Sequence, residues 1–156
     1  MEKGLAPGDR APTFKFQTDD RGEISTASLK GAPFVLYFYP KDDTPGCTKE
    51  AIGFSEAKKK FDSAGVVVIG VSKDSPESHK KFRTKHKLKI SLASDPDIKA
   101  AEAYGVWGEK TLYGRKYMGM ERATFLVDGK GVIRQIWRKV KVPGHVEAVL
   151  AAAREL

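Results

Sequence analysis

Two stretches of the chain are apolar throughout and have the length of a β-strand. Residues 34–39 are Phe-Val-Leu-Tyr-Phe-Tyr, and residues 66–71 are Val-Val-Val-Ile-Gly-Val. Such runs are typical of strands buried on both faces of a sheet, as in parallel sheets covered by helices. A shorter stretch at 90–92, Ile-Ser-Leu, is a third candidate strand. The pattern therefore predicts a buried central sheet.

Two β-hairpins are also expected, one before these strands in the sequence and one after them. Residues 14–16 alternate Phe, Lys and Phe before a polar turn at 19–22, and residues 23–25 can return as the second arm. Near the other end of the chain, the strand-like runs 123–127 and 132–137 flank Asp-Gly-Lys-Gly. Asp-Gly between two such runs is a strong hairpin signal.

Helical patterns fill the segments between the strands. Ser-Pro at 75–76 and Asp-Pro at 95–96 each put a capping residue before a proline that suits the first helical position. At 146–153, apolar residues recur at i, i+3, i+4 and i+7, which predicts an amphipathic helix. Another helix follows the first buried strand, with apolar positions at Ala51, Phe54 and Phe61.

Strands that alternate with helices, followed by a hairpin and a final helix, predict an α/β domain. We expect a central mixed β-sheet flanked by helices, with an N-terminal β-hairpin, which is the layout of the thioredoxin-like fold. Because no linker interrupts the pattern, residues 1–156 are expected to form a single domain.

Charge and apolar content narrow the classes of partner. Lys and Arg number 28 against 20 Asp and Glu, a formal net charge of +8. The lysines are spread along the chain and no aromatic-basic recognition motif accompanies them, so we expect no nucleic-acid partner. No apolar stretch approaches the roughly 20 residues that span a bilayer. The first residues lack the apolar core of a signal peptide, so a cytoplasmic protein without a membrane partner is expected.

Cysteine and histidine content limits the chemistry further. Cys47 is the only cysteine, which excludes an intramolecular disulfide and zinc sites built from several cysteines. The three histidines, at 79, 86 and 145, lack metal-ligand spacing. We therefore expect neither a metal nor a cofactor, and any redox chemistry must use the one thiol.

Cys47 lies where the first buried strand gives way to a helix. Thr44 can cap this helix and Pro45 suits its first position, so Cys47 falls within the first turn. Free N–H groups and the positive end of the helix dipole favour a thiolate there. However, Cys47 is also on the apolar stripe of the helix, as an inert buried cysteine would be. Position alone leaves both interpretations open.

The surrounding residues distinguish the two. Pro40-x-x-x-Thr44-x-x-Cys47, with Pro45 and Gly46 in the gap, resembles the active-site motif of the peroxiredoxins. The longer segment 38–48 is similar to the Q-type subfamily, the bacterioferritin comigratory proteins. The resemblance covers nearly the whole chain and includes the segments 8–14, 70–74, 95–96, 104–107 and 121–128.

The resemblance implies a thiol-dependent peroxidase for hydrogen peroxide and organic hydroperoxides, and a role for four residues. Cys47 is the peroxidatic cysteine that becomes a sulfenic acid. Thr44 hydrogen-bonds the peroxide, although by itself it would be a helix cap. Pro40 shields the thiolate, although by itself it would only end a strand. Arg122 pairs with the thiolate and the leaving oxygen, although a lone arginine before a strand is more often a surface residue. Either Glu50 or Glu121 can orient this arginine or compete for it.

The chain departs from many Q-type relatives at one position. These proteins often carry a resolving cysteine five residues after the peroxidatic one, where this chain has Ile52, and the sequence leaves open whether Ile52 is natural or engineered. The resemblance thus implies a one-cysteine cycle in which thioredoxin, glutaredoxin or glutathione reduces the sulfenic acid. Thr44 occupies the position of the first cysteine in a Cys-x-x-Cys motif, so an internal dithiol cycle is excluded.

Three questions stay open in the sequence. The aromatic stretch 106–120 can pack over the core, or it can form an apolar wall near the thiolate or a docking surface. A binding protein that uses the basic surface, and a thiol sensor that turns over poorly, are the alternative functions. The expected assembly is a monomer or a weak homodimer.

Overall fold

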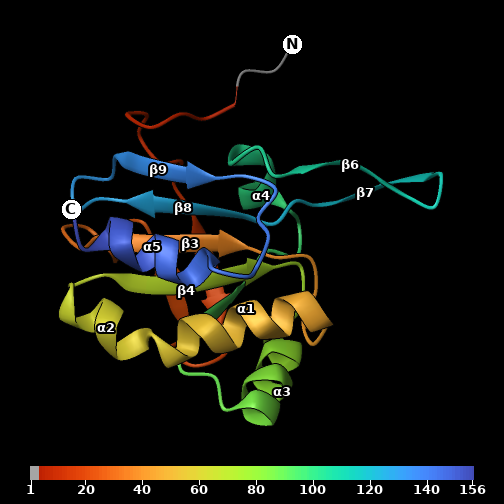
Figure 1. Cartoon of the computed structure of the whole chain (residues 1–156), viewed down its shortest axis with the longest axis horizontal. Coiled ribbons are helices and arrows are strands. Elements are labelled where there is room, and N and C mark those ends of the chain that lie inside the picture. The colour runs from red at the N-terminus through yellow and green to blue at the C-terminus, as the bar shows by residue number, and fades with distance from the viewer. Residues whose placement is uncertain (1–3) are drawn as a thin grey trace.

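The structure, a computed structural model, describes residues 4–156. Seven strands in this range form one mixed sheet in the order β2-β1-β5-β4-β3-β8-β9, and two more strands form a separate hairpin (Figure 1). The strands are β1 (Lys15–Thr18), β2 (Glu23–Ser25), β3 (Phe34–Phe38), β4 (Val67–Ser72), β5 (Ser91–Ser94), β6 (Trp107–Leu112), β7 (Arg115–Met120), β8 (Ala123–Val127) and β9 (Ile133–Trp137). The helices are α1 (Pro45–Glu56), α2 (Lys58–Ser63), α3 (Pro76–His86), α4 (Lys99–Ala103) and α5 (His145–Ala153). The neighbouring strands β3, β4 and β5 run parallel, and the other pairs are antiparallel.

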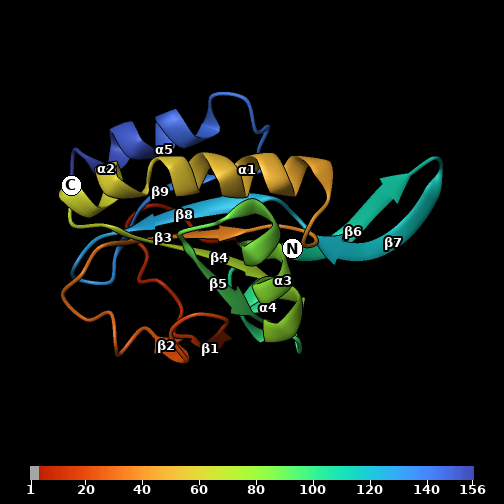
Figure 2. The ribbon, with the colours of Figure 1, turned by 90° about the horizontal axis from the view of Figure 1, so that it is seen from below.

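The central strands are buried on both faces, which explains their uninterrupted apolar sequences. On β3, Val35 and Tyr37 belong to one hydrophobic cluster, whereas Leu36 and Phe38 belong to another on the opposite face. Helices α1, α2 and α5 cover the first face, and α4 lies on the second (Figure 2). None of the helices in the described part of the chain is both long and apolar enough to cross a membrane.

The predicted fold class is confirmed: helices flank a central mixed sheet of the thioredoxin-like kind. The N-terminal hairpin forms between β1 and β2, and β1 also pairs with β5, so this hairpin extends the main sheet. The second predicted hairpin is β8–β9, and the predicted amphipathic helix at 146–153 is α5.

Two predicted helices differ in detail from the structure. The helix that follows Thr44 was expected to continue to Phe61, but it is interrupted at Ala57, where the Lys60 amide donates to the Ala57 carbonyl three residues back. The helix expected directly after Asp95 begins only at Lys99. The Asp95 carboxylate still accepts hydrogen bonds from two amides of that helix, so it caps α4 from a distance along the chain.

The aromatic stretch at 106–120 forms the β6–β7 hairpin, which projects from the body of the molecule (Figures 1 and 2). Only the base of this hairpin packs on the core, through Val106, Met120 and the partly buried Trp107. Tyr113 at the tip is 96% exposed. The interpretation that the whole stretch covers the core is therefore wrong.

Candidate active site

The sequence Thr-Pro-Gly-Cys places Cys47 in the first turn of α1. Pro45, at the first helical position, has no N–H group, and the amide of Thr48 donates to the carbonyl of Thr44 at 2.8 Å. Among residues 4–156, no acceptor takes the amides of Gly46 and Cys47. Both amides can therefore donate to an anion or to a peroxide oxygen. Cys47 itself is only 1% exposed, so water has little access to its sulfur.

Arg122 lies between β7 and β8 and reaches the thiol. Its Nη2 donates to Cys47 Sγ at 3.4 Å, and its Nη1 donates to Glu50 Oε1 at 2.7 Å. Glu50 follows Cys47 by three residues on α1, so both side chains are on the same face of the helix. Burial opposes the charge on Arg122, but Glu50 and Cys47 outweigh it and raise the pKa of the guanidinium. Arg122 is therefore a permanent positive charge beside the sulfur.

Glu50 is the acid that orients this arginine. Glu121, the other acid that the sequence offers for this role, binds Arg138 instead, with its Oε1 2.8 Å from Arg138 Nη2. The Glu50 side chain is fully buried, and this burial raises its pKa to about 7 against the opposing effect of Arg122. Its second oxygen, Oε2, has no hydrogen-bond partner among the described residues.

A buried histidine completes this polar cluster. His145, the first residue of α5, has its Nε2 2.8 Å from Thr124 Oγ1 and 4.0 Å from Glu50 Oε2. Burial and the nearby charge of Arg122 lower the pKa of His145 to about 4. His145 is therefore neutral at neutral pH, and it contributes polarity without a second positive charge.

Thr44 is at the N-cap position of α1, but its side chain does not cap the helix. Its hydroxyl donates to the carbonyl of Lys41 at 2.9 Å, which corrects the expectation of a side-chain cap. Since that bond uses the hydroxyl hydrogen, the oxygen lone pairs remain available as acceptors. Pro40 is half-buried and directly follows the apolar run 34–39, where the polar loop toward Thr44 begins.

A buried polar network, not anticipated from the sequence, holds the loop between Pro40 and Thr44. Asp42 accepts from Tyr39 Oη at 2.6 Å, and its Oδ2 lies 2.7 Å from Nδ1 of His79 on α3. The amide of Asp42 donates to Asp74 at 2.8 Å. These contacts join the loop to Tyr39 just after β3, to α3 and to the segment after β4, and so they fix the position of Thr44.

Gly46 is a second residue whose role the sequence did not indicate. A Cβ atom at this position would lie 3.1 Å from Nη2 of Arg122. Its backbone conformation is ordinary for a helix, so space explains the glycine and backbone strain does not. The absence of a side chain lets the guanidinium approach Cys47.

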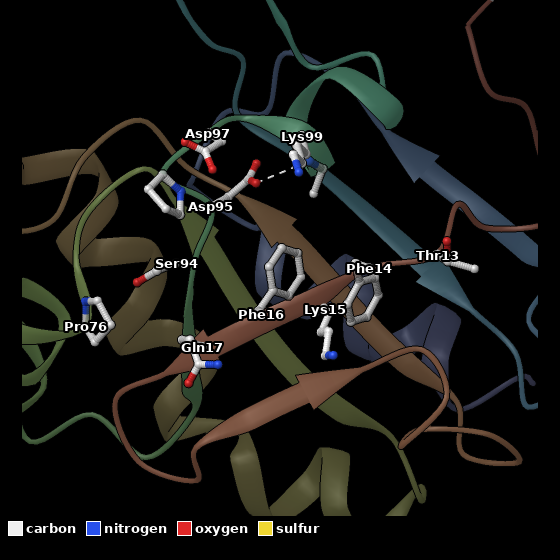
Figure 3. A pocket seen from close by; sticks show the side chains of 12 residues that line it. Thr13, Phe14, Lys15, Phe16, Gln17, Pro76, Ser94, Asp95, Asp97 and Lys99 are labelled. Carbon is white, nitrogen blue, oxygen red and sulfur yellow. Dashed lines mark hydrogen bonds between the residues drawn. The ribbon is translucent and has the colours of Figure 1, made fainter.

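Elsewhere in the described chain, the hollows lack comparable chemistry. One of about 660 Å³ is lined by β1 residues and by the segment that leads into α4, including Phe14, Phe16 and Asp95 (Figure 3). It contains no cysteine, and the Asp95 carboxylate is used in capping α4. Within residues 4–156, no three His, Cys, Asp or Glu side chains are arranged to hold a metal ion.

The geometry around Cys47 suits attack by its sulfur on a weak bond between two electronegative atoms, one of which leaves with negative charge. A sulfur nucleophile, a fixed positive charge and two free amides converge at the start of α1. Positive charge and donors that are already in place stabilise negative charge as it develops on a leaving oxygen, without further reorganisation.

Comparison with known proteins identifies the family. Residues 7–136 match the AhpC/TSA family. The chain is 51% identical over 143 residues to a putative peroxiredoxin Bcp of Coxiella burnetii, which covers 92% of this chain and 95% of that protein. It is 44% identical over 149 residues to peroxiredoxin Bcp of Bacillus subtilis, which covers 96% and 95% of the two chains.

Solved structures agree with the sequence comparison. The bacterioferritin comigratory protein of Xanthomonas campestris, studied for alkyl peroxide reduction, matches with a TM-score of 0.86 at 41% identity, over 91% of this chain and 90% of that one. A cysteine-to-serine variant of Xylella fastidiosa PrxQ matches with a TM-score of 0.92 at 34% identity, over 99% and 98%. The Xanthomonas protein has been solved as serine variants of two different cysteines, whereas this chain has one cysteine. The chain therefore belongs to the AhpC/TSA family and is a peroxiredoxin of the Q type, the bacterioferritin comigratory protein group.

Proposed function

We propose that Cys47 is the peroxidatic residue of this thiol-dependent peroxidase, with Arg122, Thr44 and Pro40 as its catalytic partners. The observation that carries the assignment is the 3.4 Å contact from Arg122 Nη2 to Cys47 Sγ at the start of α1. Substrates of the proposed site are hydrogen peroxide and organic hydroperoxides; alkyl peroxide reduction by the Xanthomonas relative supports the second class.

In the proposed reaction, the Cys47 thiolate attacks the terminal oxygen of the peroxide. An S–O bond forms while the O–O bond breaks, the sulfur gives up two electrons, and the other oxygen leaves and takes a proton to become an alcohol or water. Cys47 is left as a sulfenic acid. Arg122 and the amides of Gly46 and Cys47 stabilise the charge on the leaving oxygen. Thr44 accepts a hydrogen bond from the peroxide, and Pro40 limits the access of water.

The sulfenic acid is returned to a thiol by a reductant from outside the chain, because no second cysteine exists to resolve it. We propose thioredoxin, glutaredoxin or glutathione for this step. Ile52, half-buried on α1, occupies the position where many Q-type proteins have a resolving cysteine.

We further propose one domain over residues 1–156, a monomer or weak homodimer, and a cytoplasmic location. A reducing compartment suits this cycle, because external thiols must outcompete further oxidation of Cys47.

The test is steady-state consumption of hydrogen peroxide and cumene hydroperoxide with thioredoxin, with glutaredoxin plus glutathione, and with dithiothreitol. Wild type should turn over with at least one of the three, and Cys47→Ser with none. Residual turnover by Cys47→Ser would refute the assignment. Fast single-turnover oxidation of Cys47 with negligible steady-state rates for every thiol would favour the thiol sensor instead.

A further inference from the structure

The exposed apolar surface of the protein is concentrated on the β6–β7 hairpin. Across residues 4–156, five large hydrophobic side chains are exposed, and four of them belong to this hairpin. They are Leu112, Tyr113, Tyr117 and Met118, with exposed fractions of 55%, 96%, 45% and 57%. Clusters of this kind on an otherwise polar surface mark interaction sites.

One face of the hairpin combines apolar and basic side chains without an acid. Leu112 pairs with Arg115 and Lys110 pairs with Tyr117 across the strands, and these two pairs are two residues apart, so all four side chains are on one face. We call these four residues the docking face. The one acid of the hairpin, Glu109, pairs with Met118 on the opposite face.

The hairpin lies next to the reactive thiol. Strand β7 ends at Met120, and Arg122, which contacts Cys47, follows two residues later. A groove of about 630 Å³ at the base of the hairpin is lined by bases that include Lys110, Arg122 and Arg138. Two acids, Glu109 and Glu121, also line it, and Glu121 is paired with Arg138. Figures 1 and 2 both show the hairpin projecting from the end of the molecule where α1 begins.

Nothing else in the described part of the chain stabilises the outer hairpin. Strands β6 and β7 form their own two-stranded sheet, so each has a free outer edge. Near the base, Lys110 Nζ donates to the Met120 carbonyl at 2.9 Å, and Lys73 lies over the Trp107 ring at 5.4 Å. A two-stranded hairpin is marginally stable by itself, and free edges favour contact with another chain.

The charge and the chemistry indicate the occupant. A second copy of this chain would place basic hairpins and a net charge of +8 against each other. An acidic protein complements the docking face, and the one reactant that must reach Cys47 in every cycle besides peroxide is a thiol. We propose that the docking face and the groove at its base bind an acidic protein dithiol, which reduces oxidised Cys47. This inference rests on the proposed function.

In the bound complex, the two thiols of the partner supply the two electrons that reduce the Cys47 sulfenic acid. One partner thiolate attacks the Cys47 sulfur, an S–S bond forms, the S–O bond breaks and the oxygen leaves as water. The second partner thiolate attacks the partner's own sulfur in this mixed disulfide, and Cys47 leaves as the thiolate. The partner is thereby oxidised to a disulfide and supplies both electrons.

The test compares a thioredoxin of negative net charge with dithiothreitol as reductants of the whole protein. The double variant Lys110→Glu/Arg115→Glu, which reverses both bases of the docking face, should lower kcat/KM for the thioredoxin by about tenfold or more at low ionic strength, and added salt should shrink this difference. The variant Leu112→Ser/Tyr117→Ser should also lower kcat/KM, but without that salt dependence. Rates with dithiothreitol should stay at the wild-type value in both variants.

Lys59→Glu/Lys60→Glu is the matched control, because it changes the net charge equally on α2, at the opposite end of the molecule from the hairpin (Figure 1). Equal losses in the control and the hairpin variants, or no loss in the hairpin variants, would overturn the proposal. So would a loss with dithiothreitol, dimers in sedimentation that depend on the hairpin, or hairpin-dependent binding to phosphatidylserine vesicles with unchanged thioredoxin kinetics. If wild type consumes no peroxide even with dithiothreitol, the proposed function itself fails.

Discussion

Arg122 and Cys47 are 75 residues apart in sequence, and their contact is set by the pairing of β3 with β8. Arg122→Ala removes the fixed positive charge beside the sulfur, so the peroxide step should slow by about 10²-fold or more. Arg122→Lys keeps a positive charge but cannot bridge Glu50 and Cys47 with one planar group. Its rate for the peroxide step should therefore lie between those of wild type and Arg122→Ala. Stopped-flow oxidation rates under single-turnover conditions measure this. A wild-type rate in Arg122→Ala would remove Arg122 from the mechanism.

Thr44 allows a separation of structural and catalytic roles. Its hydroxyl donates to Lys41 and does not cap α1, so Thr44→Val costs one exposed hydrogen bond and little helix stability. The same change removes the proposed acceptor for the peroxide and should slow the peroxide step about tenfold, whereas Thr44→Ser should keep the rate. Single-turnover rates beside melting temperatures decide this. Lower melting temperature with an unchanged rate would leave Thr44 a structural residue only.

Gly46 tests how closely the guanidinium must approach. In Gly46→Ala, the new methyl would lie 3.1 Å from Arg122 Nη2, which Glu50 holds at its other nitrogen. Alanine is a better helix former than glycine, so the change itself does not weaken α1. We therefore expect a slower peroxide step without lower stability, by single-turnover rates and urea unfolding. An unchanged rate would show that Arg122 can shift without consequence.

At the scale of elements, α5 meets α1 and β8 through a buried neutral imidazole. The pKa of His145 is lowered from 6.5 to about 4, so below pH 6.5 the unfolded chain binds a proton that the folded protein excludes. Folding stability therefore falls as the pH decreases from 6.5 toward 4. His145→Gln should lose less stability than wild type over this window, as measured by urea unfolding.

Glu50 on α1 acts in the opposite direction. Its pKa is raised from 4.5 to about 7, so between these values the folded protein keeps a proton that the unfolded chain releases. Stability due to this group falls as the pH rises through that window, and Glu50→Gln should remove the fall. When the free energy of unfolding is plotted against pH, the His145→Gln and Glu50→Gln variants should thus diverge from wild type with opposite slopes. A variant whose plot runs parallel to that of wild type would contradict the burial of the group it replaces.

The elements that the sequence predicted well are those specified by local patterns. Apolar runs and turn residues placed β3, β4 and the β1–β2 and β8–β9 hairpins, and Thr-Pro placed the start of α1. The interruption at Ala57 was missed, because apolar spacing continues across it. The β6–β7 hairpin was missed as well, because its strands combine glycines, charges and aromatic residues without alternation toward one buried face.

At the scale of the whole molecule, residue identities could be predicted but their contacts could not. The motif indicated Cys47 and Arg122, yet the pairing of Glu50 rather than Glu121 with Arg122 depends on long-range packing. One signal was present: Glu50 is a carboxylate on the apolar stripe of α1. The contact of Asp42 with His79 had no comparable signal, because it joins two segments 37 residues apart.

We propose that one buried thiol, that of Cys47, carries the whole peroxidase cycle. With no second cysteine in the chain, the oxidised form has no internal partner and must wait for an external thiol. While it waits, a second peroxide can oxidise it to a sulfinic acid, which thiols do not reverse. Activity should therefore decline under excess peroxide and be preserved when thiol is added early.

The most direct measurement is mass spectrometry of the intact protein after one equivalent of peroxide, with dimedone present and thiol absent. We expect a monomer that carries a single dimedone adduct on Cys47, and a sulfinic acid in place of the adduct when excess peroxide is added without dimedone. A Cys47–Cys47 disulfide between two chains as the main product, or an unmodified Cys47, would contradict the account.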